Sequence, residues 1–149
     1  MEWMLRAFKT VFHHELFHML DWVYAARRDD EAGYDDHEWK AIHQQFGDTF
    51  TYDTDQDTTT AYQDDLALYS LELGTGSRGF ANSYQRSAVW EDKACLFAYL
   101  HTDQSSLLQM CVLDSILNAK VCRLFEICAD IDEALNEDFF VNLTQFEYS

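Results

Sequence analysis

Residues 3–26 carry apolar side chains at spacings of three and four, the repeat that places them on one face of an α-helix. These apolar positions are Leu5, Phe8, Phe12, Leu16, Met19 (or Leu20) and Val23. Proline, which breaks helices, is absent from the whole sequence. We therefore expect a single long N-terminal helix with these residues as its apolar face.

Shorter periodic segments follow, with turn-forming residues between them. We expect further helices at 35–46, 61–73, 89–100 and 105–118, the last with a continuation through 135 after a bend. Polar or glycine-rich loops are expected at 27–35, 47–60 (with one short strand) and 74–80. The C-terminal residues 138–148 alternate weakly and fit either a strand or a docked tail. The predicted fold class is therefore mainly α, with little or no β-sheet.

Length and charge narrow the range of functions before any motif is considered. With 149 residues the chain is long enough for one domain with a real core. Its 27 acidic and 10 basic residues give a net charge of −17, which argues against nucleic acid and anionic membrane surfaces as partners. Neither an apolar run of 18 residues nor a signal peptide is visible in the sequence, and the compartment stays open.

Within the predicted N-terminal helix, residues 14–18 match the pattern H-E-x-x-H. Residues four apart lie on the same side of a helix, so His14 and His18 can each direct one ring nitrogen at a single ion. Zn²⁺ accepts such nitrogens, and Glu15 is placed to act as general base on a water beside the metal. The alternative is a pair of buried histidines held by backbone or carboxylate groups. His13 lies about 100° around the helix from His14 and is not expected to share the ion.

A catalytic zinc site needs a third protein ligand, and the sequence offers several. The extended pattern H-E-x-x-H-x-x-G-x-x-H fails, since Asp21 stands in place of its glycine. The candidates are Asp21, His37, His43, Glu72, Glu91 and His101. Glu91 is favoured because the helix that it begins has a face of small residues, which lets a neighbouring helix approach closely. That face consists of Ala94, Cys95 and Ala98. The alternative for Glu91 is an exposed carboxylate at a helix N-terminus.

Two separated segments of the sequence resemble a known group of enzymes. The first is HELFHMLD, and the second has the form S-Y-x-R-(x)4-E-x-x-A, matched by Ser83, Tyr84, Arg86, Glu91 and Ala94. Together they resemble zinc metallopeptidases of the gluzincin type, in particular a bacterial family of zinc-binding metallopeptidases. The resemblance extends from about residue 10 to about residue 103.

The resemblance implies a zinc peptidase that acts on a peptide or protein substrate. It implies His14, His18 and Glu91 as the Zn²⁺ ligands and Glu15 as the general base. It also implies that Tyr84 donates a hydrogen bond to the oxyanion of the tetrahedral intermediate, a role that suits a phenol. The alternative for Tyr84 is an amphipathic tyrosine at the surface or at the boundary of the core.

Two departures from the family pattern bear on activity. Cys95 stands where the family has a glutamate that can support the metal site. A β-sheet usually precedes the active-site helix, whereas this sequence begins almost at that helix. We expect residues 1–149 to form one zincin-like domain, either a minimal version without that sheet or one in which a short later segment replaces it. Asp21 matches H-E-x-x-H-x-x-D and is expected either to orient a ligand or a neighbouring basic group, or to lie on the surface.

Two functional hypotheses follow from these residues. The first is a zinc-dependent peptidase with Glu15 and Tyr84 as its catalytic residues. The second is a zinc-binding but catalytically inactive interaction protein, which Cys95 and the missing sheet favour.

Weaker signals concern the acidic segment 53–64 and the cysteines. The segment resembles a calcium loop, with acidic positions at Asp53, Asp55, Asp57 and Asp64. Thr58 replaces the required glycine, so a solvated acidic loop is favoured. The four cysteines form no C-x-x-C pair, and their apolar helical surroundings favour buried free thiols.

Overall fold

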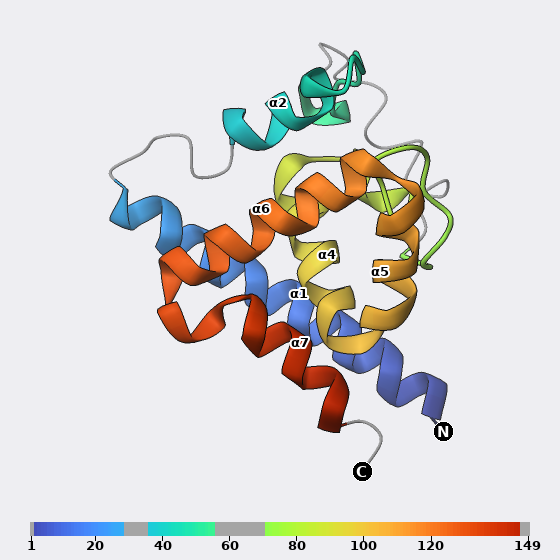
Figure 1. The fold of residues 1–149 in the computed structure, drawn as a ribbon, viewed down its shortest axis with the longest axis vertical. Helices are drawn as coiled ribbons and strands as arrows, with labels where there is room; N and C mark the ends of the chain where they lie inside the picture. Colours follow the sequence, from blue (N-terminus) through green and yellow to red (C-terminus); the bar gives the residue numbers. More distant parts are fainter. Residues whose placement is uncertain (1, 29–35, 56–70, 147–149) are drawn as a thin grey trace.

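A computed structural model describes residues 2–28, 36–55 and 71–146 and contains six α-helices and no β-strand in these ranges (Figure 1). The helices are α1 (Glu2–Arg27), α2 (His37–Gln45), α4 (Val89–Thr102), α5 (Gln104–Leu113), α6 (Ser115–Ile131) and α7 (Glu137–Phe146). Short 3₁₀ turns occur at Asp53–Asp55, Tyr84–Arg86 and Glu133–Leu135. The predicted mainly-α fold is confirmed. No helix in the described part of the chain is long and apolar enough to cross a membrane.

Capping side chains explain where two of the helices begin. The Asp36 carboxylate accepts a hydrogen bond from the Trp39 backbone N–H and starts α2. The Asp114 carboxylate accepts from the backbone N–H groups of Ile116 and Leu117, at 3.0 and 3.1 Å, and starts α6. The sequence predicted one helix across Asp114. Instead, α5 ends just before this residue and α6 begins just after it.

Three other predictions of secondary structure disagree with the residues that the structure describes. The C-terminal segment is the helix α7 and not a strand, because Phe140 lies fully buried in the core with Phe139 and Leu143 against it at helical spacing. Of the helix predicted at 61–73, residues 61–70 lie outside the described ranges, and 71–73 are not helical. The short strand predicted within 47–60 is absent from its described residues, 47–55.

The long helix α1 is as predicted, but it buries a different side from its most regular apolar stripe. Its buried residues are His14, Phe17, Asp21 and Tyr24, again at spacings of three and four. The apolar stripe stays largely in solvent, with 56% of Leu5, 67% of Phe8, 54% of Phe12 and 68% of Met19 exposed. Since α1 is apolar on more than one side, periodicity alone does not determine which side packs inward. The buried side is the one whose polar groups find partners on α4.

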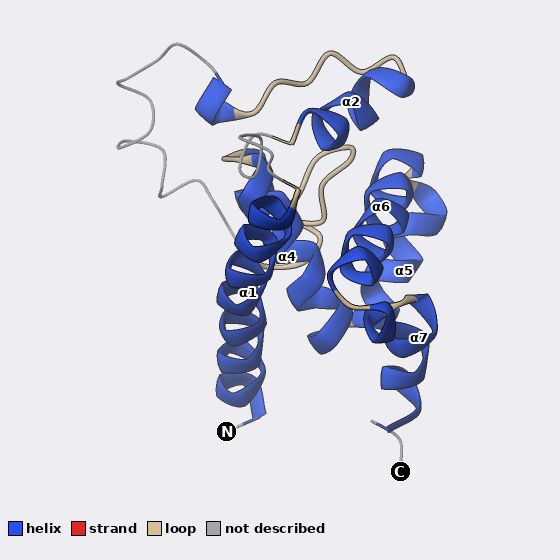
Figure 2. Ribbon diagram, turned by 90° about the vertical axis from the view of Figure 1, so that its left-hand side faces the viewer, coloured by secondary structure: helices blue, strands red, loops and turns tan. Residues whose placement is uncertain are grey.

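Helix α4 lies at the centre of the molecule, between α1 on one side and α5, α6 and α7 on the other (Figure 2). Its most extensive contact is with α1. Ala94, Cys95 and Ala98 are all buried. Side chains this small let two helix backbones approach closely, so the small-residue face predicted for the Glu91 helix is confirmed.

A buried polar cluster around Asp92 joins α4 to α2 and α6. Its carboxylate accepts hydrogen bonds from Trp39 Nε1 (2.9 Å), the Tyr52 hydroxyl (2.5 Å), Gln85 Nε2 (2.6 Å) and Lys120 Nζ (2.7 Å). Asp92 and Lys120 are both fully buried. A buried charge is tolerated only when it is paired and hydrogen-bonded, so these two side chains depend on each other.

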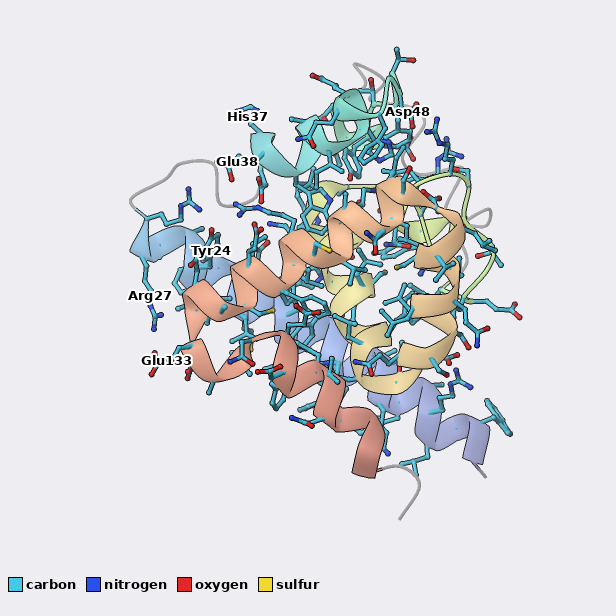
Figure 3. The ribbon with its side chains drawn as sticks, viewed as in Figure 1. Tyr24, Arg27, His37, Glu38, Asp48 and Glu133 are labelled. Carbon is cyan, nitrogen blue, oxygen red and sulfur yellow. The ribbon has the colours of Figure 1, made fainter. Side chains whose placement is uncertain are left out.

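The segment that follows α2 closes over this cluster. His43 at the end of α2 lies beside Phe50 and Phe80, with 5.0 Å between ring centroids in each case. Gly79 has a φ of +83°, and a Cβ there would lie 2.7 Å from His43 Cε1, so only glycine fits. Glu38, at the start of α2, pairs with Arg123 of α6 (Figure 3). These contacts hold α2 on the core.

Replacing Asp92 with alanine is expected to lower the free energy of unfolding by about 3–5 kcal/mol, because it leaves the Lys120 ammonium buried without its partner. Urea denaturation followed by circular dichroism measures this change. Asp130→Ala is the matched control, since Asp130 is an exposed aspartate of α6 and its loss should cost less than about 0.5 kcal/mol. A loss below about 1 kcal/mol for Asp92→Ala would contradict the coupling of the two charges.

Candidate metal centre

The packing of α4 on α1 brings the side chains of His14, His18 and Glu91 together. The His14 Nε2 atom lies 2.9 Å from Glu91 Oε2 and 3.1 Å from His18 Nε2. The third distance, from His18 Nε2 to Glu91 Oε2, is 3.4 Å. Among the described residues, the nitrogen and oxygen atoms of these three side chains lie close enough together to hold a metal ion. The arrangement follows from two sequence features, the four-residue histidine spacing on α1 and a glutamate in the first turn of α4.

The three atoms suit a tetrahedral zinc ion in both spacing and type. Zinc binds imidazole nitrogen and carboxylate oxygen at about 2.0–2.2 Å, which puts tetrahedral ligand atoms about 3.3 Å apart. The three separations in this cluster run from 2.9 to 3.4 Å. Two histidines and one glutamate also leave a fourth position free, as catalytic zinc sites require.

Electrostatics within the cluster favour a charged carboxylate. Burial by itself raises the pKa of Glu91, but hydrogen bonds from His14 and His18 outweigh it and lower that pKa to about 2. The pKa of His18 is raised, mainly by its hydrogen bond to Glu91. Glu91 is therefore ionised at any ordinary pH, which a metal ligand has to be.

The other ring nitrogen of His14 meets a sulfur atom. Cys95 Sγ lies 3.6 Å from His14 Nδ1, and the cysteine is buried. Burial raises the pKa of this thiol, so it is a neutral hydrogen-bonding partner. Ligating histidines usually bond through their second nitrogen to a carboxylate or a carbonyl, which fixes the ring. Here the Cys95 thiol takes the position of that carboxylate or carbonyl beside His14 Nδ1, and His14 Nε2 faces Glu91.

Asp21 lies one helical turn beyond His18 and is buried, so its surface alternative is wrong. Its carboxylate pairs with Lys93 of α4, with 2.7 Å between Lys93 Nζ and Asp21 Oδ2. Lys93 is also 3.5 Å from Asp36. The predicted role of orienting a neighbouring basic group fits this geometry. Lys93 itself was missed, and its position next to two acidic residues in the first turn of α4 was the signal available in the sequence.

Glu15 and Tyr84 lie at the edge of the cluster. Both line a small hollow of about 110 Å³ that also contains His14 and Cys95. The Tyr84 ring centroid is 6.1 Å from that of His14, and its 3₁₀ turn precedes α4 directly. Glu15 is exposed. The hollow thus has a carboxylate and a phenol beside His14, and these are groups that can serve general base catalysis and oxyanion stabilisation.

The remaining candidates for a third ligand have other environments. His37 is exposed and projects outward from α2 (Figure 3). His43 bonds through Nδ1 to Asp48 at 2.8 Å. His101 Nδ1 bonds to the Phe97 carbonyl at 2.8 Å, and its ring stacks on His13 with centroids 4.3 Å apart. Glu72 is exposed on the loop after residue 70. None of these four belongs to the metal-binding group found among the described residues.

The weaker sequence signals have mixed outcomes. Of the acidic segment, Asp53–Asp55 form a 3₁₀ turn in which Asp55 pairs with Lys40, and residues 56–64 lie outside the described ranges. All four cysteines are free thiols, as predicted. Burial was predicted for all of them, but Cys122 is exposed because it lies on the outer side of α6.

Comparisons with family models, with curated proteins and with solved structures found no match to this chain. The residues of this chain and their geometry are therefore what indicate a function.

The burial of His101 predicts a loss of stability in mild acid. Burial lowers the pKa of this histidine to about 4, and the pKa of His13 beside it is lowered as well. The unfolded chain therefore takes up protons below about pH 6.5 while the folded chain does not, and stability falls as the pH drops from about 6.5 to about 4. At about 1.4 kcal/mol per pH unit, His101 accounts for up to about 3 kcal/mol.

Urea denaturation at a series of pH values tests this prediction with His101→Leu, which cannot take up a proton. The pH dependence of the variant should be flatter than that of the unmodified protein between about pH 6.5 and pH 4. His37→Leu is the comparison variant, because it replaces an exposed histidine in place of a buried one. Identical profiles for His101→Leu and the unmodified protein would refute a depressed pKa at His101.

Proposed function

We propose that the protein is a zinc-dependent peptidase whose metal is held by His14, His18 and Glu91. The observation that carries the proposal is the convergence of two Nε2 atoms and one carboxylate oxygen at separations of 2.9–3.4 Å. The resemblance of the same residues to gluzincin-type metallopeptidases supports it. The hollow that contains Glu15 and Tyr84 beside His14 supports a catalytic rather than a purely structural site.

Zinc held by His14, His18 and Glu91 would supply Lewis acidity and would lower the pKa of a bound water towards about 7. In the proposed mechanism Glu15 is the general base that takes a proton from the attacking water as its oxygen bonds to the peptide carbonyl carbon. Tyr84 donates a hydrogen bond to the carbonyl oxygen as it becomes negative. Glu15 then passes the proton to the leaving amine as the carbon–nitrogen bond breaks. One water is consumed, and an acid and an amine are formed.

The ligand assignment predicts that purified protein binds about one zinc per chain. His18→Ala should weaken this binding by more than about 100-fold, beyond the loss that partners outside the ligand set typically cause. Competition with a fluorescent chelator measures the affinity. His37→Ala is the control, since His37 is an exposed histidine of α2 outside the cluster. Absence of zinc binding in the unmodified protein would rule out both the peptidase and the inactive zinc-binding protein.

The role of Glu15 predicts a separation of catalysis from metal binding. Glu15→Gln keeps the shape of an exposed side chain but removes the base, so cleavage should fall by about 10²–10⁴-fold while zinc content stays unchanged. Unfolded casein is a suitable substrate, with new amino groups counted over time. Glu133→Gln, at an exposed glutamate far along the chain, is the control and should retain full activity.

The three possible patterns of cleavage have different meanings. Cleavage lost in Glu15→Gln alone supports the proposal. Equal cleavage by Glu15→Gln and the unmodified protein points to a contaminating protease and contradicts it. No cleavage by any zinc-loaded form favours the second hypothesis, a zinc-binding interaction protein. The supporting observation is the buried contact between Cys95 and His14, in place of a carboxylate.

A further inference from the structure

A groove runs along the N-terminal half of α1, next to the hollow that contains His14 and Glu15. It has a volume of about 680 Å³. Thr10, Val11, Leu71 and Tyr99 line both this groove and the small hollow beside His14 and Glu15. The two hollows therefore adjoin, and Val11 of α1 and Leu71 both lie at their shared boundary.

The wall opposite α1 is an irregular segment that is fixed to α4. Tyr99 of α4 donates a hydrogen bond from its hydroxyl to the Leu71 carbonyl at 2.5 Å. Asn82 Nδ2 donates to the same hydroxyl, also at 2.5 Å. This chain of bonds holds Leu71 at the rim of the groove, where 46% of the residue is exposed.

Val11 and Leu71 give the inner part of the groove exposed apolar surface, whereas charged side chains lie further out. Val11 is 49% exposed although it lies beside the candidate site. The charged residues lie further out, where Arg6 pairs with Asp103 and Glu72 lies nearby. A ligand in the inner part would bury apolar surface, which stabilises binding by about 25 cal/mol per Å².

We propose that this groove binds the substrate as an extended peptide with an apolar side chain one or two residues from the cleaved bond. The inference rests on the proposed peptidase function. Trp3 to His14 spans eleven residues of helix, or about 16 Å at about 1.5 Å per residue. An extended peptide covers that length with about five residues. Val11 is three helical residues from His14, about 4.5 Å, which corresponds to one or two peptide residues.

The test measures peptide binding in Glu15→Gln, a form that binds without cleaving, both with and without added zinc. The probes are two fluorescently labelled eight-residue peptides of glycine and serine that differ at one position, leucine in one and aspartate in the other. The Glu15→Gln protein should bind the leucine peptide at least about tenfold more tightly, the usual value of an apolar contact in a pocket.

A second substitution, Val11→Lys, should reduce the ratio of the two affinities, leucine peptide over aspartate peptide, to nearly one. Leu71→Lys on the opposite wall should have the same effect. Both residues are about half exposed, so the fold should survive, as circular dichroism can verify. Val112→Lys is the matched control, because Val112 is 85% exposed on α5 and outside the groove. It should keep the full preference.

Equal affinity for both peptides, or an unchanged preference in Val11→Lys and Leu71→Lys, would overturn the groove assignment. Failure of the peptidase proposal has a different signature. In that case the leucine preference and its dependence on Val11 persist, but zinc does not bind or the zinc-loaded unmodified protein does not cleave.

Discussion

Three consecutive charged residues in the first turn of α4 find partners in three directions, and the candidate site depends on this arrangement. Glu91 meets the two histidines of α1, Asp92 accepts hydrogen bonds from α2 and α6, and Lys93 pairs with Asp21. Successive helical residues point about 100° apart, so the three contacts together fix the rotation of α4 about its axis. The close approach that Ala94 and Ala98 allow fixes its distance from α1.

This arrangement makes the site a consequence of the core. Breaking a buried ion pair by removing one partner is costly, because the remaining charge is left without compensation. Asp92 and Lys93 are both buried and point about 100° apart around the α4 axis, so a rotation that moved Glu91 away from the histidines would also separate both pairs. The position of Glu91 therefore does not depend on its own contacts alone, and the three ligand atoms can be held close together before any ion binds.

The part of the site that could be predicted from the sequence was the part set by local spacing. The four-residue interval places His14 and His18 on one side of a helix whatever surrounds it, and small residues after Glu91 indicate close packing. The contacts of Cys95 with His14 and of Tyr99 with Leu71 depend on how two segments are rotated relative to each other, which no single stretch of sequence determines. The same reason explains why the buried side of α1 could not be inferred, since that helix is apolar on several sides.

The exposed apolar side of α1 favours association between copies of the protein, and the negative charge of the chain opposes it. Phe8, Phe12 and Met19 are each more than half exposed, and a surface of this kind favours association between copies. A net charge of −17 opposes that association, because two copies repel each other as they approach. A short uncharged peptide meets no such repulsion and can reach the apolar inner groove at Val11. The same charge thus disfavours contact between copies at the exposed side of α1, whereas it does not exclude a short uncharged peptide from the proposed groove.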